Sequence, residues 1–285
     1  MRELERRSPG ARGLSLFWRL WLPDEASTRG RVLLAHGYAE HGGRYLHTGE
    51  RLTRAGWEVV VPDHRGHGRS QGRPVSVVRF DDYVEDLHAI AAEVAAERGN
   101  APTVLLGHSM GGLIAAVYAL RHAGELRGLV LSAPAVLPGR VSAISVGAGR
   151  LLARVTPELG VLRLPLDKIS RDPAVVAAYR ADPLVHARPV RARLGAEMLR
   201  AMDEVGAGLP AWTLPILVMQ GSADRLVDPG AAGYVHSRVG SRDRTLRVYP
   251  GLYHEILNEP EREQVLDDLL DWLDRLVPVT TAVGG

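Results

Sequence analysis

The residues best suited to chemistry form the pentapeptide Gly107–Gly111, whose letters GHSMG follow the pattern G-x-S-x-G. In this pattern the chain turns sharply at the serine, and the glycines avoid a clash where the backbone approaches itself. The hydroxyl of Ser109 would project at the positive end of a helix, with the backbone N–H of Met110 directed at a developing oxyanion. We expect Ser109 to be a nucleophile in acyl transfer and Met110 to supply one oxyanion N–H.

A serine nucleophile needs a general base, and the base needs an acid that orients it. Where a G-x-S-x-G turn joins a strand to a helix, these groups follow in the chain order serine, acid, histidine. Asp224 comes after the apolar stretch 214–221, and His254 comes after the stretch 245–251. We therefore expect Asp224 to be the acid and His254 the base. Asp228 competes for the acid's role, but its position before a proline favours an ordinary turn or helix start.

The second oxyanion N–H should come from the loop after the apolar stretch 31–37. We expect Tyr38 to donate it, with Gly37 allowing the backbone to approach a substrate. The block 63–70, DHRGHGRS, has the residue types of a metal or phosphate site, yet the sequence has no G-K-[ST] and the two histidines lack a partner cluster. We expect a structural turn that braces the loops near the oxyanion hole, and no metal site.

These residues need a scaffold that presents several loops at one edge of a sheet. Short stretches rich in Val, Leu and Ile alternate with helical stretches, which predicts an α/β fold with a mostly parallel sheet covered on both faces. The stretch 14–23 is expected to be a first strand that pairs antiparallel at the edge of the sheet. The other predicted strands are 31–37, 57–63, 103–107, 126–134, 214–221 and 245–251, and the predicted helices are 48–56, 80–99, 109–124 and 261–277.

Residues 137–212 interrupt this alternation. They contain no convincing strand, and the stretches 141–155 and 173–185 have a helical pattern with Pro and Gly between them. We expect residues 1–136 and 213–285 to form the core and residues 137–212 to form an inserted cap of short helices.

The composition is that of a globular chain, because 46% of the 285 residues are apolar and 24% are charged. There is no cysteine, which excludes disulfides and a thiol nucleophile and favours a reducing compartment. A net charge of +2 is not the dense basic footprint of a nucleic-acid-binding protein. The charged stretch 1–13 is unlike a signal peptide, and no apolar run of about 18 residues occurs, so we expect a cytoplasmic protein without a membrane span.

Six blocks of the sequence resemble the α/β-hydrolase fold and, more narrowly, its monoacylglycerol lipase family. GHSMGG and GSAD occur in many α/β-hydrolases, whereas HGYAEHGGRY and AYRADPLV are more telling of the narrower family. The blocks span the core and reach into the cap: residues 36–45, 63–72, 107–112, 169–185, 220–228 and 249–261.

The resemblance implies an α/β-hydrolase with a cap that cleaves monoacylglycerol into glycerol and a free fatty acid. The reaction would pass through an acyl-enzyme intermediate without a metal or cofactor. The matching positions make Ser109, Asp224 and His254 the catalytic triad. They also make Tyr38 and Met110 the oxyanion hole.

The resemblance places contacts to the substrate as well. Glu40, Arg44 and Tyr179 fall where family members contact or frame the glycerol end. From the residues alone, Glu40 and Arg44 could equally form only a local ion pair. Some members carry a second histidine three residues after the catalytic one; here that position is Leu257, so the polar contacts to the head group are expected to differ.

The same triad would also serve other reactions, because the fold and the triad do not choose the substrate. A short- or medium-chain carboxylesterase, a lysophospholipase and a perhydrolase remain alternatives. An aminopeptidase would need acidic cap residues to hold the substrate amine, and the cap is rich in arginine instead. Epoxide hydrolases and dehalogenases would have aspartate at position 109. A ligand-binding protein on a retained hydrolase fold is the alternative that is not an enzyme.

The cap is the expected selector of a small lipid ester as substrate. Its apolar residues suit an acyl-chain tunnel, and the stretch 141–155 suits either packing onto the core or transient contact with a membrane surface. Arg150 and Arg154 would then face anionic lipid. We expect a cytoplasmic protein with peripheral membrane contact and no nucleic-acid partner; no oligomeric state follows from the sequence.

Overall fold

The computed structural model describes residues 1–24, 28–139, 147 and 152–278. Its centre is one eight-stranded sheet with the strand order β1-β2-β4-β3-β5-β6-β9-β10. The strands from β4 to β10 in this order are parallel, which confirms the predicted fold class. The strands are β1 (Arg2–Pro9), β2 (Ser15–Leu22), β3 (Gly30–Ala35), β4 (Trp57–Pro62), β5 (Thr103–His108), β6 (Gly128–Ser132), β9 (Ile216–Gly221) and β10 (Arg244–Tyr249).

The N-terminal edge of the sheet differs from the prediction. The stretch expected to be the edge strand, β2, is antiparallel as expected, but it lies between β1 and β4. The edge strand is β1, which the sequence analysis did not predict. Its residues RELERRSP are mostly exposed and charged, so no hydrophobic alternation marks the strand. Charged side chains on an edge strand also discourage pairing with other molecules.

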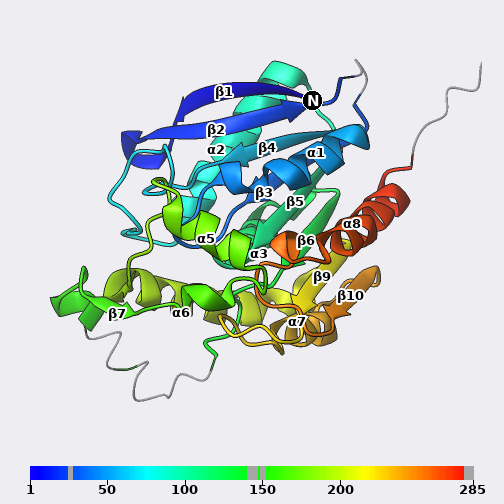
Figure 1. The fold of residues 1–285 in the computed structure, drawn as a ribbon. Coiled ribbons are helices and arrows are strands. Elements are labelled where there is room, and N and C mark those ends of the chain that lie inside the picture. Colours follow the sequence, from blue (N-terminus) through cyan, green and yellow to red (C-terminus); the bar gives the residue numbers. More distant parts are fainter. Residues whose placement is uncertain (25–27, 140–146, 148–151, 279–285) are drawn as a thin grey trace, which may run out of the picture.

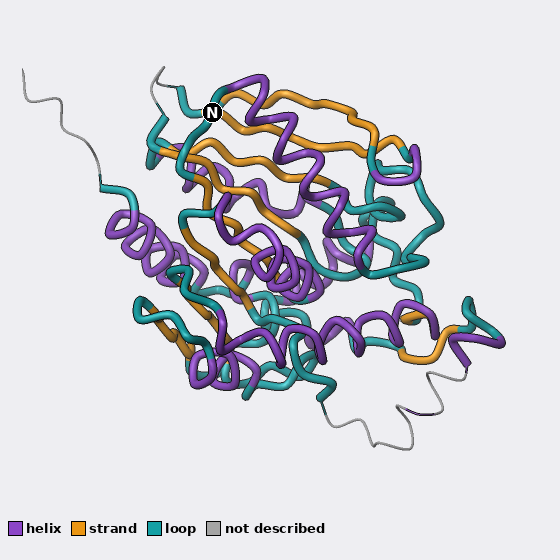
Figure 2. Tube along the Cα trace, turned by 180° about the vertical axis from the view of Figure 1, so that it is seen from behind, coloured by secondary structure: helices purple, strands orange, loops and turns teal. Residues whose placement is uncertain are grey.

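Helices cover both faces of the sheet, as Figures 1 and 2 show from opposite sides. One hydrophobic cluster lies under α1 (Leu46–Arg54) and α8 (Arg262–Leu276), and a second lies under α2 (Asp81–Arg98), α3 (Met110–His122) and α7 (Ala231–Arg238). Alternate residues of one strand enter opposite clusters, as the period of two requires: in β5, Leu105 packs in one cluster and Val104 and Leu106 pack in the other.

Residues 137–212 connect β6 to β9 and contain β7 (Gly160–Leu162), α5 (Pro173–Ala181), β8 (Val190–Arg191) and α6 (Ala192–Gly208). The expectation of a cap without strands is wrong, because β7 and β8 form a short antiparallel pair. The helix expected over 173–185 ends at Ala181, and α6 was not predicted. Most of the stretch 141–155, with Arg150, lies outside the described residues.

The division into core and cap stays a prediction. Helix α6 contacts α3, and its residues Leu194, Ala201 and Val205 are buried in the same cluster as the core. The described residues also form short 3-10 helices at Ala11–Gly13, Gly42–Tyr45, Ala123–Glu125 (η3), Leu166–Lys168, Leu209–Ala211 and Ile256–Asn258. Within the described part of the chain, no helix combines the length and the apolar character needed to cross a bilayer.

Candidate active site

Ser109 occupies a strained turn between β5 and α3. Its backbone has φ 55° and ψ −118°, a conformation that non-glycine residues rarely adopt. A Cβ atom at Gly107 would lie 2.3 Å from the carbonyl oxygen of Gly111, and one at Gly111 would lie 2.1 Å from that of Ala35. Only glycine fits at either position. The backbone N–H of Ser109 donates a hydrogen bond to the carbonyl oxygen of Ser132 (2.9 Å), which ties the turn to the neighbouring strand β6.

Asp224 and His254 meet at the same edge of the sheet, after β9 and β10 respectively. The Nδ1 atom of His254 lies 2.8 Å from Oδ2 of Asp224, and both side chains are buried. The other carboxylate oxygen accepts hydrogen bonds from the N–H groups of Leu226 (2.8 Å) and Val227 (3.2 Å). Gln220 donates to Oδ2 at 2.8 Å. The carboxylate is therefore held in one orientation toward the imidazole.

The charges of this pair shift both pKa values. Burial alone would raise the pKa of Asp224, but the adjacent His254 and the hydrogen bonds hold that pKa below its ordinary value. Burial alone would lower the pKa of His254, yet the carboxylate of Asp224 outweighs it, so that pKa lies above its ordinary value. Such a pair suits an imidazole that must accept a proton and be stabilised as the cation.

Asp228, the other candidate for the acid, stabilises the turn before α7 instead. Its Oδ1 accepts a hydrogen bond from the backbone N–H of Gly230 (2.8 Å), and its carbonyl accepts one from Ala231, the first residue of α7. This is the turn and helix start that the sequence favours for Asp228.

The loop after β3 brings Gly37 close to Ser109, and Tyr38 follows directly in the chain. A Cβ atom at Gly37 would lie 3.4 Å from Cβ of Ser109, so this part of the backbone passes close to the proposed nucleophile. Met110 is the first residue of α3, and its N–H has no partner within the helix. Ala39, just after Tyr38, has a positive φ of 65°. Backbone strain at this point is typical of a loop held for function.

The side chain of Glu40 anchors this loop through hydrogen bonds and an ion pair. Its Oε1 accepts hydrogen bonds from the N–H of Gly37 (2.6 Å) and the hydroxyl of Tyr45 (2.7 Å), and its Oε2 pairs with Arg44 (2.5 Å). Burial, opposed by Arg44 and assisted by the nearby Glu255, raises the pKa of Glu40. The contact between Glu40 and Arg44 is the local ion pair that the sequence allowed, and it is buried, since Glu40 is only 3% exposed.

Arg44 is shared between two carboxylates. It makes a bidentate pair with Glu255 (2.8 and 2.7 Å) besides its contact with Glu40, and its guanidinium lies 4.6 Å from the ring centre of Tyr179 in the cap. Sequence analysis missed Glu255, although its place directly after His254 was a usable signal. Leu257 is buried in a hydrophobic cluster.

The segment 137–212, expected to be a cap, contacts the loop 36–45 at several points besides Tyr179. Each tie joins a residue of that loop to a residue between α5 and β8. The contacts are His41 Nε2 with Asp182 Oδ2 (2.9 Å), the Tyr38 hydroxyl donating to the Arg188 carbonyl (3.1 Å), and the His186 N–H donating to the Ala39 carbonyl (2.8 Å).

The block 63–70 is the structural turn that the sequence predicts. Asp63 accepts hydrogen bonds from the N–H groups of Gly42 (2.9 Å) and Arg69 (2.8 Å). The N–H of His64 donates to Nε2 of His36 at 2.9 Å. Burial lowers the pKa of His64 to about 3, so the ring stays neutral. These contacts brace the strand ends that carry the loop with Gly37 and Tyr38.

Comparison with known proteins agrees with this geometry. The model of the serine aminopeptidase S33 family matches residues 26–261. A monoacylglycerol lipase of Mycolicibacterium smegmatis is 43% identical over 269 residues, which cover 93% of this chain and 94% of that protein. A monoglyceride lipase of Rattus norvegicus is 35% identical, with 95% and 91% covered. The crystal structure of a monoacylglycerol lipase from Paleococcus ferrophilus superposes with a TM-score of 0.82 at 30% identity, covering 92% of this chain and 99% of that one. The chain belongs to the monoacylglycerol lipase family of the α/β-hydrolases.

Proposed function

We propose that this protein is a monoacylglycerol lipase, which hydrolyses the ester of a monoacylglycerol to glycerol and a free fatty acid. The observation that carries the proposal is the buried 2.8 Å contact between His254 and Asp224 at the sheet edge where Ser109 stands on its strained turn. The similarity to lipases over more than nine-tenths of the chain supports the choice of substrate.

In the proposed mechanism Ser109 attacks the ester carbonyl while His254 accepts its proton. Asp224 keeps the imidazole in one tautomer and stabilises the imidazolium. The N–H groups of Tyr38 and Met110 bind the oxyanion of the tetrahedral intermediate. His254 then protonates the departing glycerol, and a water molecule attacks the acyl-enzyme by the same sequence of proton transfers.

The glycerol end of the substrate is proposed to lie near Glu40, Arg44 and Tyr179. Because Arg44 already serves two carboxylates, its main task would be to fix Glu40 and the ring of Tyr179 in place. The head-group pocket would thus be shaped by a rigid network and would leave little room for a second acyl chain.

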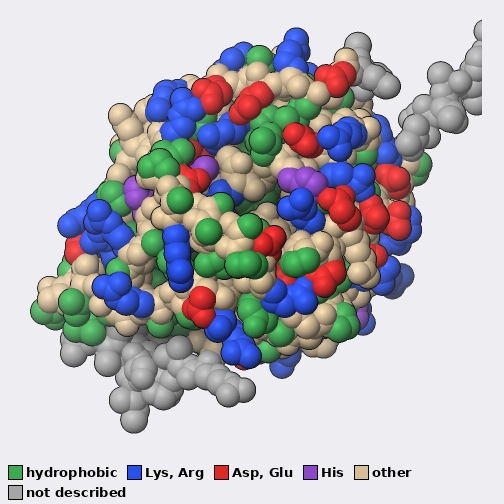
Figure 3. All heavy atoms as spheres, in the orientation of Figure 1, with side chains coloured by type: hydrophobic (Ala, Val, Ile, Leu, Met, Phe, Trp, Pro, Cys, Tyr) green, Lys and Arg blue, Asp and Glu red, His purple; other side chains and the backbone are tan. Residues whose placement is uncertain are grey.

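The cap is proposed to meet lipid transiently. Apolar side chains around β7 are unusually exposed for their type, and Figure 3 shows hydrophobic groups at this end of the molecule, at the lower left. They are Val155, Leu159, Val161 and Leu162, with exposed fractions between 43% and 71%. Arg154 and Arg163 are exposed beside them and would face anionic headgroups.

The deciding experiment measures fatty-acid release from a medium-chain monoacylglycerol, with the matched diacylglycerol beside it. The rate of release from monoacylglycerol should fall by several orders of magnitude in Ser109→Ala. With the wild-type protein, release from the diacylglycerol should be far slower than release from the monoacylglycerol. Cleavage of simple aryl esters with little release from monoacylglycerol would favour a general carboxylesterase. Ligand binding without turnover, together with no labelling of Ser109 by a fluorophosphonate, would favour the ligand-binding alternative.

A further inference from the structure

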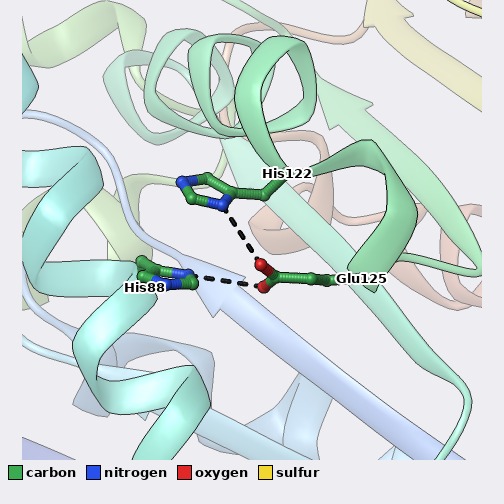
Figure 4. A group of neighbouring side chains, drawn as sticks. All are labelled: His88, His122 and Glu125. Carbon is green, nitrogen blue, oxygen red and sulfur yellow. Dashed lines mark hydrogen bonds and ion pairs between the residues drawn. The ribbon is translucent and has the colours of Figure 1, made fainter.

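Two histidines and a glutamate gather at the end of α3 that is remote from Ser109. His122 is the last residue of α3, Glu125 ends η3, and His88 faces them from α2 (Figure 4). Helix α3 has 13 residues, so at 1.5 Å per residue the cluster lies about 20 Å from the nucleophile. The proposed lipase chemistry has no use for these side chains at that distance.

Both imidazoles of the cluster contact the carboxylate of Glu125. Nδ1 of His122 lies 3.1 Å from Oε1 of Glu125, and Nδ1 of His88 lies 3.3 Å from Oε2. One ligand atom from each residue can be chosen so that all three lie within 4.8 Å of one another. The two imidazoles are stacked, with ring centres 4.1 Å apart and planes 15° from parallel. Two imidazoles and one carboxylate from three different elements therefore lie close enough together to share one ion.

This set has the composition of a transition-metal site. Imidazole nitrogen and carboxylate oxygen bind Zn²⁺ at about 2.0–2.2 Å, which puts the ligands of a tetrahedral ion about 3.4 Å apart. The two nitrogen–oxygen separations already have this size. A modest rotation of each ring about its Cβ–Cγ bond would turn both Nδ1 lone pairs toward a shared ion. The hydroxyl of Tyr118, which donates to Oε2 of Glu125 (2.9 Å), fixes the carboxylate as outer groups do in metal sites.

The surroundings permit an ion to enter. The side chains of His88, His122 and Glu125 are 38%, 25% and 48% exposed. A cavity of about 550 Å³ lies beside them, lined by His88, Tyr118 and Glu125. It leaves room for a water molecule as a fourth ligand. Arg31 also lines this cavity, and its guanidinium pairs with the buried carboxylate of Glu58 at 3.1 Å, which Arg98 contacts as well.

We propose that His88, His122 and Glu125 bind one Zn²⁺ ion, or a similar divalent transition-metal ion, which joins α2 to the end of α3. Sequence analysis predicted no metal site, because His88 is far from the others along the chain and only the fold brings it near. The ion would stabilise the folded chain, since anything that binds only the native state does so. The proposal is independent of the substrate that Ser109 attacks.

The test is a calorimetric titration of ZnCl₂ into full-length protein freed of metal with EDTA. We expect one Zn²⁺ per chain, with affinity lowered about tenfold or more in His88→Gln and in His122→Gln. His47→Gln is the matched control, because His47 also contacts a glutamate (Glu263, 2.7 Å) at the surface but belongs to no such three-residue cluster among the described residues. Co²⁺ should bind the wild type with the visible absorption of a site that contains nitrogen ligands.

A thermal melt gives a second readout. Zn²⁺ should raise the Tm of the wild type and of His47→Gln but leave His88→Gln and His122→Gln unchanged, with circular dichroism showing that all four are folded. Hydrolysis by Ser109 should be the same with and without the ion. The proposal would be overturned if the wild type bound no Zn²⁺, or if His88→Gln and His122→Gln bound it as tightly as the wild type. Neither result would affect the lipase assignment.

Discussion

The carboxylate of Glu40 accepts a hydrogen bond from the backbone N–H of Gly37 at 2.6 Å, one residue before the proposed oxyanion donor Tyr38. This hydrogen bond fixes the peptide between His36 and Gly37, which directly precedes the peptide that carries the Tyr38 N–H. Since Arg44 and Tyr45 hold the same carboxylate, the position of the proposed oxyanion hole should depend on this buried network of hydrogen bonds and charges.

Removing Glu40 should therefore damage catalysis more than binding. We expect Glu40→Ala to lower kcat by about 10²-fold, in the range seen when an oxyanion donor is lost, with a smaller change in KM. Glu40→Gln should retain part of the rate, because its amide oxygen can still accept from Gly37. Tyr45→Phe, which removes only the other hydrogen bond to Oε1, is the control and should remain close to the wild type. Equal losses in all three variants would mean that Glu40 acts only through stability, which a parallel urea melt would reveal.

The pH profile should report the pair of His254 and Asp224. The base must be neutral, so activity falls as the pH drops through the pKa of His254. That pKa is raised, so the acid limb of kcat/KM should lie above the ordinary value for imidazole of about 6.5. In Asp224→Asn the largest charge that raises this pKa is gone, and burial opposes the smaller contributions of Glu255 and Glu40. The acid limb should therefore move to lower pH while kcat falls about 10⁴-fold.

Asp228→Asn is the matched control for this measurement, because the carboxamide can still cap Gly230. It should keep both the rate and the profile of the wild type. A loss of activity in Asp228→Asn with a normal Asp224→Asn would reverse the assignment of the acid.

The parallel strands from β4 to β9 could be predicted from the sequence because they are buried on both faces and appear as mostly apolar runs. The strand β1 could not, since nearly all its side chains face solvent and leave no pattern. The pair β7–β8 is too short, and too exposed in β7, to differ from loop.

The residues of the site likewise include some that the sequence predicts and some that only the folded structure reveals. Ser109, Asp224 and His254 follow strands, and the topology alone orders them along the chain. Glu255 could have been found from its place directly after His254. The ties from Asp182 and His186 to the loop 36–45 depend on tertiary contacts, which a local sequence pattern does not encode. The cluster of His88 and His122 was not predicted either, because only the fold brings these residues together.

The glycines of the nucleophile turn should be intolerant of substitution for steric reasons. In Gly111→Ala the new Cβ would lie 2.1 Å from the carbonyl oxygen of Ala35, which is backbone and cannot rotate away. We expect a loss of about 3 kcal/mol or more in the free energy of unfolding, at the upper end of overpacking costs. Gly233→Ala is the matched change in α7, where nothing lies within 4 Å, and should stabilise by about 0.5–1 kcal/mol through helix propensity. Urea denaturation measures both, and a mild effect at Gly111 would show that the turn has room to relax.

The exposed apolar residues near β7 should matter only when the substrate lies in a lipid surface. Leu159 and Leu162 are about half exposed, and changing both to serine removes apolar area without touching Ser109 or its partners. We expect weaker binding to vesicles that contain anionic lipid and slower release of fatty acid from monoacylglycerol embedded in them, with unchanged cleavage of a water-soluble aryl ester. Val248→Ser is the control, since Val248 is 49% exposed on β10, outside the cap. A fall in aryl-ester cleavage would show instead that these leucines support the fold of the cap, and unchanged vesicle binding would remove β7 from the proposed contact with lipid.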